Sequence, residues 1–415
     1  MRKHVCIKHS RKCLPVAILR QVPGRSSPLQ GIAEPIYLDH AATTPVRAEV
    51  IAAMSQCHAE DFGNPSSGHA WGRRARHRLE RARTAAATAL GIPAAHVFFT
   101  RGGTESDNLA VLGRARHAIA RGGGAPLVVT SSIEHPAVFE AAEQAAEEGA
   151  RHAVIGFGDG VLDLDALKAA VRQGPAVVSC MWVNNEVGLQ LPIAAISKLC
   201  REHAVVLHSD AVQAVGKVPL ALRDNPVDLL TVTGHKIHGP TGTGALIATN
   251  PTGLQPLQFG GGQERGVRPG TEDVAGAVGL AEALRLAVEE VEAESTRLGT
   301  IRDAVQARLA ARVADLRING EGLPRAPHIL SLGIPGTDSD TLLAALDARG
   351  IAASGGSACA SGSSAPSRTL ATLYPGETAA TLRLSFGHLN RARQVDRIVD
   401  SVTTAIERTR DFVRR

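Results

Sequence analysis

Short apolar runs alternate with amphipathic stretches along the first two thirds of this chain. Four of the apolar runs are short enough for buried strands, and they span residues 96–100, 126–130, 176–180 and 205–208. The stretches around them carry apolar residues at helical spacing and predict helices over residues 104–121, 136–148, 164–172 and 192–203. Alternation of this kind predicts a mainly parallel sheet with helices on both faces, which is an α/β fold.

The pattern changes after about Glu272, where a helical stretch rich in alanine, leucine, glutamate and arginine runs to about Arg312. The region beyond it is mixed. Its expected strands span residues 329–332, 351–353 and 382–386, and its expected helices span residues 339–349 and 393–410. We therefore expect two domains: a large one over residues 48–290 and a smaller α+β domain built from residues 36–47 and 291–415.

Composition narrows the class of protein. With 415 residues, of which 44% are hydrophobic, the chain is long enough for an enzyme with a cleft between two lobes. It has no run of ~20 apolar residues, the length that a transmembrane helix needs. We therefore expect a cytoplasmic protein that does not contact a membrane. Six cysteines at irregular spacing, with no CxxC pair, indicate reduced thiols and no structural metal site.

The formal net charge of +5 comes from the first residues of the chain. Residues 1–33 hold seven of the 45 basic residues and no acidic one, so the remainder carries 38 basic against 40 acidic residues, a charge of −2. The body of the chain therefore gives no reason to expect direct nucleic-acid binding. We expect residues 1–35 to form a disordered basic extension, with an organelle-targeting segment or an upstream start codon as open alternatives.

Polar residues follow several of the predicted strands, and ligands of open α/β sheets bind beyond the carboxyl ends of the strands. One such segment, Gly102-Gly103-Thr104, opens a helix, where backbone N–H groups and the helix dipole favour a phosphate. The other segments contain His135, Asn185, Asp210 with Gln213, and Lys236 within Thr233–Lys236. Taken singly, each has a plainer interpretation as a tight turn, a helix cap or a surface charge.

Together these residues fit one cofactor, pyridoxal phosphate. A lysine that follows a strand and a glycine can be desolvated and hold the cofactor as a Schiff base, and Lys236 is in that position. Asp210, a buried carboxylate beside the pyridinium nitrogen, would stay ionised and keep the ring protonated. The glycine turn before Thr104 would hold the phosphate, and His135 would stack on the ring.

Eight motifs strengthen this interpretation because they are similar to those of cysteine desulfurases. They lie at residues 37–45, 63–67, 104–108, 134–135, 183–188, 210–211, 233–236 and 260–271. The resemblance implies the fold-type I architecture of class V aminotransferases and a homodimer. It implies a cofactor site made of Gly103, Thr104, His135, Asn185, Asp210, Gln213, Thr233, Gly234, His235, Lys236 and, from the partner subunit, Thr271. Gln213 would contact the ring hydroxyl, and Asn185 with Arg383 would clamp the substrate carboxylate.

Cys359 distinguishes desulfurases from other enzymes of this superfamily. It lies in the loop 354–367, whose small polar residues and glycines predict a mobile segment and an exposed thiol. Cys180 and Cys200 lie in apolar stretches instead and are expected to be buried and inert. The resemblance implies that L-cysteine becomes L-alanine while its sulfur passes to Cys359 as a persulfide. An acceptor protein, such as an iron–sulfur scaffold, would then take the sulfur, with His135 and Lys236 as the proton carriers.

Three alternatives stay open at this point: a selenocysteine lyase, another class V enzyme that forms no persulfide, and a non-catalytic scaffold of a sulfur-assembly complex. The scaffold would lack the lysine, aspartate or cysteine, and none of the three is missing. Two departures from the usual motifs, at residues 101–103 and 355–356, remove no catalytic group. The basic stretch 73–83 is interpreted as a solvated helix face, with docking of an acidic partner as the alternative.

Overall fold

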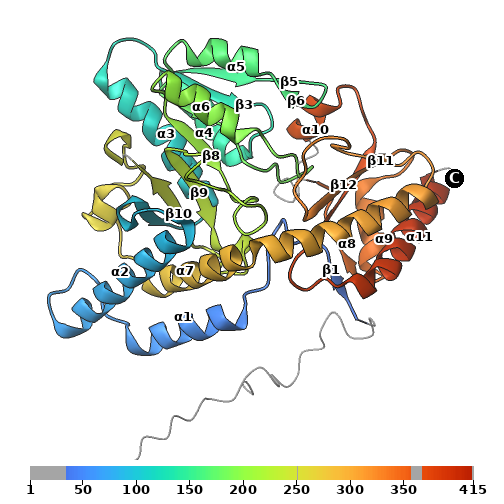
Figure 1. The fold of residues 1–415 in the computed structure, drawn as a ribbon, viewed down its shortest axis with the longest axis horizontal. Coiled ribbons are helices and arrows are strands. Elements are labelled where there is room, and N and C mark those ends of the chain that lie inside the picture. The colour runs from blue at the N-terminus through green and yellow to red at the C-terminus, as the bar shows by residue number, and fades with distance from the viewer. Residues whose placement is uncertain (1–33, 250, 357–366, 414–415) are drawn as a thin grey trace, which may run out of the picture.

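A seven-stranded sheet forms the centre of the fold in the computed structural model, which describes residues 34–249, 251–356 and 367–413 (Figure 1). Its strands, in spatial order, are β2 (Val97–Thr100), β10 (Gly244–Ala248), β9 (Leu229–Thr233), β8 (Leu207–Asp210), β7 (Val177–Ser179), β3 (Leu127–Ser131) and β4 (Arg151–Ile155). Strand β10 runs antiparallel to both β2 and β9, and the other neighbours pair in parallel. The predicted α/β fold with a mainly parallel sheet is confirmed.

Helices cover both faces of this sheet because its strands carry apolar residues on both sides. Phe98 of β2 belongs to a hydrophobic cluster with Leu109 of α3 (Gly103–Arg121). Its chain neighbours Val97 and Phe99 belong to the cluster on the other face. That cluster includes residues of α1 (Ala48–Glu60), α2 (Ala70–Leu90), α6 (Ile193–Glu202) and α7 (Val274–Glu289). The helix α4 (Pro136–Glu147) packs beside α3, and α5 (Leu164–Val171) lies beside β4.

A second hydrophobic core surrounds the antiparallel sheet of β11 (Arg317–Ile318), β12 (Ile329–Ile334) and β14 (Ala380–Ser385). Helices α8 (Val291–Arg312), α9 (Ser339–Asp347) and α11 (Val395–Val413) pack with this sheet and with one another. The short strand β1 (Ile36–Tyr37) joins this core by pairing with β13 (Ile351–Ala352). We propose that the two cores correspond to the two domains expected from the sequence, with residues 36–47 in the smaller one.

The helical stretch predicted to run to Arg312 consists of two helices. Helix α7 ends at Glu289, and α8 begins at Val291. The break lets α7 pack against α1 and α2 in the large core, while α8 packs against α11 in the second core (Figure 1). Glu290 therefore marks the crossing from one core to the other.

The basic stretch 73–83 lies on α2, and most of its charge is neutralised within the chain. Arg74 and Arg78 bond to Asp61 at 2.6 and 2.8 Å. Arg83 is buried and binds Glu264 through two hydrogen bonds of 2.7 and 2.8 Å. These internal partners weaken the case for an acidic docking partner at this helix, because paired charges offer less attraction to a second protein.

The described cysteines and helices bear on two further expectations. Cys57, Cys180 and Cys200 are buried free thiols, so the expected burial of the last two is confirmed. Burial raises the pKa of the Cys200 thiol to about 12. Within the described ranges, no helix has the length and apolar character to cross a membrane.

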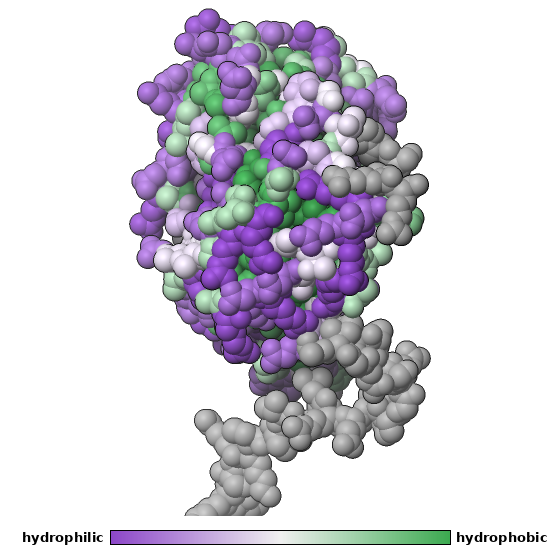
Figure 2. Space-filling model, turned by 90° about the vertical axis from the view of Figure 1, so that its right-hand side faces the viewer, coloured by the Kyte–Doolittle hydropathy of each residue, from purple (hydrophilic) through white to green (hydrophobic). Residues whose placement is uncertain are grey.

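The face of the second core that Figure 2 shows is mostly hydrophilic, with some hydrophobic residues near its centre.

Candidate active site

The turn between β2 and α3 forms the first part of the site. Gly102 has a φ of 141°, which favours glycine, and the first N–H groups of α3 follow it directly. A Cβ at Gly103 would lie 3.1 Å from Cγ2 of Val212, so this position has little room for a side chain. Thr233 at the end of β9 lies alongside, since a Cβ at Gly102 would be 3.8 Å from its Oγ1. Together these N–H and hydroxyl groups could hold a phosphate.

Asp210 is the last residue of β8, and its carboxylate is buried. Its Oδ1 accepts a hydrogen bond of 2.8 Å from the Val212 N–H. Burial raises the pKa of Asp210, while His135 and Lys236 act in the opposite direction. Imidazole and carboxylate atoms of Asp107, His135 and Asp210 all lie within 4.8 Å of one another. The strand ends therefore bring His135 and Asp210 together.

His135 stands at the N-terminus of α4 and also caps that helix. Its Nδ1 accepts a hydrogen bond of 3.1 Å from the Ala137 N–H. The plain interpretation of this residue as a cap is therefore correct, and it does not conflict with a second role. The cap fixes the orientation of the ring.

Two buried acids, Glu134 and Asp107, lie beside Asp210. The sequence alone gave neither of them a role. Burial raises the pKa of Glu134 to about 8, although Ser131 and the Met181 N–H both donate to its Oε1. Asp107 is also fully buried, and burial together with the charge of Asp210 raises its pKa. Both acids occur in motifs that had been singled out, but only the fold shows that they lie beside Asp210.

Lys236 follows β9 in a short 3-10 helix, Gly234–Lys236. Its Nζ donates hydrogen bonds of 2.6 Å to the carbonyl oxygens of Ala41 and Ala42. Gly234 is required here because a Cβ would lie 2.7 Å from the Pro240 carbonyl oxygen. The amine thus sits on the turn that leads from β1 to α1, and this turn belongs to the second core by its strand pairing.

The same turn contacts Gln213 and His235. The Gln213 side-chain amide donates to the Ala41 carbonyl at 2.9 Å, and its Oε1 lies 3.1 Å from Nε2 of His328. The Nδ1 of His235 lies 3.2 Å from Oγ1 of Thr43. Gln213, His235 and Lys236 are thereby gathered around one short segment of chain.

Arg383 lies in the middle of β14, and its side chain is buried. Nη2 pairs with Oδ1 of Asp39 at 3.0 Å, and Nη1 donates to the backbone carbonyl of Asn185 at 2.8 Å. Nε is buried without a hydrogen-bond partner within the described part of the chain. The fold therefore brings Asn185 and Arg383 together, and it adds Asp39, which sequence reasoning had given no role.

Comparison with known proteins decides the family. The model of the aminotransferase class-V family matches residues 36–398. A Bacillus subtilis (strain 168) protein named putative cysteine desulfurase IscS 1 is 39% identical over 386 residues, which cover 90% of this chain and 99% of the relative. An IscS-like cysteine desulfurase of Mycobacterium tuberculosis is 41% identical, with 90% of this chain and 97% of the relative covered.

The chain belongs to the class-V aminotransferase family. A solved structure titled NifS-like protein agrees, with a TM-score of 0.81, 30% identity, and coverage of 90% of this chain and 99% of its own. The predicted resemblance to cysteine desulfurases is thus confirmed.

The site residues fit pyridoxal phosphate, the cofactor on which class-V aminotransferases depend. The positive φ of Gly102 and the tight packing at Gly103 favour glycine at both positions, where the first N–H groups of α3 lie beside the Thr233 hydroxyl, as expected of a phosphate cradle. Asp210 is a buried carboxylate at a strand end, which suits a protonated ring nitrogen. Lys236 is within the same group of strand ends.

Two predicted residues remain. Thr271 is exposed in the segment before α7, and its role as a residue from the partner subunit stays a prediction. Cys359 lies outside the described residues. The described ends of its loop lie close to Arg383: Ser354 pairs with it through backbone hydrogen bonds, and Ser367 donates to Oε2 of Glu186 at 2.5 Å. Glu186 directly follows Asn185.

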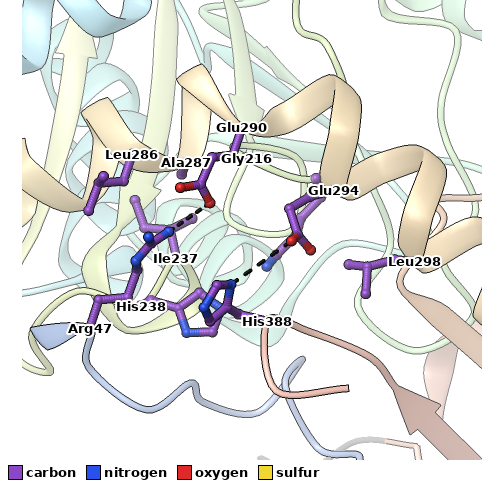
Figure 3. A pocket seen from close by; sticks show the side chains of 11 residues that line it. Arg47, Gly216, Ile237, His238, Leu286, Ala287, Glu290, Glu294, Leu298 and His388 are labelled. Carbon is purple, nitrogen blue, oxygen red and sulfur yellow. Dashed lines mark hydrogen bonds and ion pairs between the residues drawn. The ribbon is translucent and has the colours of Figure 1, made fainter. Parts of the chain in front are cut away.

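A separate pocket lies where the two cores meet, near the end of α7 (Figure 3). It is lined by charged residues, among them Arg47, Lys217, Glu290, Glu294 and His388. Arg47 pairs with Glu290 at 2.7 Å, and His388 faces Glu294 at 3.9 Å (Figure 3).

Two groups among the described residues have the spacing to hold a metal ion. One is Asp107 with His135 and Asp210, and the other is Glu290 with Glu294 and His388 in the pocket of Figure 3. Arginines already neutralise both glutamates of the second group, at 2.7 Å from Arg47 and 2.6 Å from Arg297. The prediction of no metal stays a prediction.

Proposed function

We propose that this chain is a pyridoxal-phosphate-dependent cysteine desulfurase, which converts L-cysteine to L-alanine and passes the sulfur to Cys359 and then to an acceptor protein. The observation that supports it most is that Lys236, Asp210 and His135 all follow strands of one sheet, with His135 and Asp210 close together. Relatives that are named cysteine desulfurases and match over 90% of the chain support the choice of substrate.

The cofactor would be held at both ends by residues already described. Gly103, Thr104, Thr233 and His235 would bind its phosphate, with Thr271 of the partner subunit completing the set in a homodimer. Gln213 would contact the ring hydroxyl, and Asp210 the ring nitrogen. When bound, the group supplies an electron sink for breaking the bond between Cα and its hydrogen.

Lys236 would carry the proton at Cα. The carbonyl oxygens of Ala41 and Ala42 can hold the amine in its protonated form, because two acceptors at 2.6 Å stabilise an ammonium group. Arg383 and Asn185 would fix the substrate carboxylate, and His135 would take the proton from the substrate thiol, a step usually worth about 10²–10⁴ in rate.

Cys359 would receive the sulfur. Its thiolate attacks the sulfur of the substrate, so that an S–S bond forms and the bond between carbon and sulfur breaks. The electron pair of the broken bond takes up a proton and leaves L-alanine. The step consumes one L-cysteine and one enzyme thiol, and it forms one L-alanine and one enzyme persulfide.

The test is the release of alanine and sulfide from L-cysteine by the purified protein loaded with pyridoxal phosphate, in the presence of a thiol reductant. Equal amounts of the two products are expected, and Lys236→Ala should form neither. A protein that binds the cofactor and forms no alanine would contradict the proposal. Release of selenide from selenocysteine without reaction of L-cysteine would favour the lyase instead.

A further inference from the structure

Asp39 and Arg383 form an ion pair that no local pattern predicts. Asp39 lies on the turn after β1, and Arg383 lies in β14, 344 positions later in the chain. Their closest atoms, Oδ1 of Asp39 and Nη2 of Arg383, are 3.0 Å apart. The arginine side chain is 2% exposed and the aspartate side chain 21% exposed, so solvent reaches the pair mainly at the aspartate.

The pairing leaves part of the guanidinium available. A guanidinium has five N–H donors. One is used at Asp39 and one at the Asn185 carbonyl, while Nε has no hydrogen-bond partner within the described residues although it is buried. The guanidinium therefore keeps N–H donors beyond the two that Asp39 and Asn185 use. A carboxylate suits such donors, because it accepts two parallel bonds from a guanidinium.

Asp39 restricts the directions from which that carboxylate can come. It holds Nη2 from the side of the turn, while Asn185 holds Nη1 from the loop after β7. Two acceptors on different nitrogens fix the plane of the guanidinium and not only its position. The next residues of the turn, Ala41 and Ala42, hold Lys236. One turn therefore sets the places of both the arginine and the lysine.

We propose that Asp39 is a positioning residue, which orients Arg383 for the α-carboxylate of the amino-acid substrate relative to Lys236. This inference rests on the proposed function. It assigns to Asp39 a part in substrate selection: ligands with an α-carboxylate depend on it, and amines without one do not. Its effect is carried by the hydrogen bond to Nη2, since Arg383 keeps its own charge in either case.

A competing interpretation makes the opposite prediction. If Asp39 only neutralises Arg383, then it competes with the substrate carboxylate, and its removal would tighten binding. If it only stabilises the fold, then its removal would change the binding of all ligands alike. Three substitutions separate these cases. Asp39→Ala removes the acceptor, Asp39→Asn keeps an acceptor without the charge, and Asp39→Glu keeps the charge but moves it by one methylene.

The experiment titrates the protein loaded with pyridoxal phosphate with L-alanine and with ethylamine, which is the same molecule without the carboxylate. The change in the visible absorption of the cofactor reports binding and requires no turnover. For L-alanine we expect a dissociation constant raised about 10- to 100-fold in Asp39→Ala and Asp39→Glu, because the loss of a hydrogen bond to a charged group weakens binding by about this factor. Asp39→Asn should remain within about threefold of the parent, because its amide oxygen still accepts the bond. Ethylamine should bind equally to all four proteins.

The control variant is Asp400→Ala, which removes an exposed partner of Arg312 on the surface and should leave both titrations unchanged. Tighter binding of L-alanine by Asp39→Ala would overturn the inference, and so would an equal weakening for both ligands. If Asp39→Ala does not fold, then unchanged L-alanine binding by Asp39→Glu overturns it. A parent protein that takes up the cofactor but never responds to L-alanine would refute the proposed function itself.

Discussion

Glu134 offers a sharp test of the electrostatics behind the site. It lies between β3 and His135, and its carboxyl group is fully buried. Oε1 accepts from Ser131 and from the Met181 N–H, while Oε2 has no partner among the described residues. Burial, more than the hydrogen bonds that oppose it, raises its pKa from 4.5 to about 8, and Asp210 contributes in the same direction.

The sign of the effect follows from the direction of this shift. The pKa is higher in the folded protein than in the unfolded one, so protonated Glu134 stabilises the fold fully below about pH 4.5. That contribution is lost as the pH rises through about 8. The rise of the pKa from 4.5 to about 8 corresponds to about 5 kcal/mol in total, or about 1.4 kcal/mol per pH unit within the window.

The assay is the free energy of unfolding of the apoprotein in urea, measured from about pH 5 to about pH 8. Glu134→Gln removes the titrating group and keeps its shape, so its stability should fall less steeply with pH than that of the parent, by up to about 1.4 kcal/mol per unit. Glu202→Gln changes an exposed glutamate on α6 and should keep the parent slope. Equal slopes for Glu134→Gln and the parent would mean that burial does not raise the pKa of Glu134.

Three further predictions concern other buried charges. Arg83→Met leaves Glu264 buried without its partner and should lower the free energy of unfolding by about 3–5 kcal/mol in urea, and Arg83→Met with Glu264→Leu should recover part of the loss. Burial lowers the pKa of Lys217 from 10.5 to about 8. The free energy of unfolding should therefore fall as the pH is lowered from about 10.5 to about 8, and it should fall less in Lys217→Met than in the parent. Asp210→Asn should still bind pyridoxal phosphate, seen by its visible absorption, but form alanine about 10²-fold more slowly or worse.

The elements that carry the candidate site could be predicted from local pattern. Apolar runs ended close to Thr100, Ser131 and Asp210, and the parallel sheet then required the residues after them to share one edge. Strands β4 and β10 were not predicted. Four of the five residues of β4 are not buried, so its pattern is weak, and β10 follows a glycine-rich turn that indicated a loop.

Contacts between distant segments could not be predicted. The turn at residues 39–44 meets Lys236 and Arg383 only because β1 pairs with β13 and Asp39 bridges to Ser385. No spacing along the chain encodes such a pairing. Likewise, the burial of Glu134 and Asp107 depends on which helices cover the sheet, so the raised pKa of each could be found only from the fold.

Mass spectrometry of the protein after brief reaction with L-cysteine, without reductant, detects the transfer of sulfur to the enzyme itself. We expect the peptide that contains Cys359 to gain one sulfur atom, and one alanine to form for each sulfur gained. Lys236→Ala should show neither. Cys359→Ala should retain the cofactor and carry no added sulfur. Sulfur found on Cys57, Cys180 or Cys200 instead, or alanine formed at the parent rate by Cys359→Ala, would contradict the account.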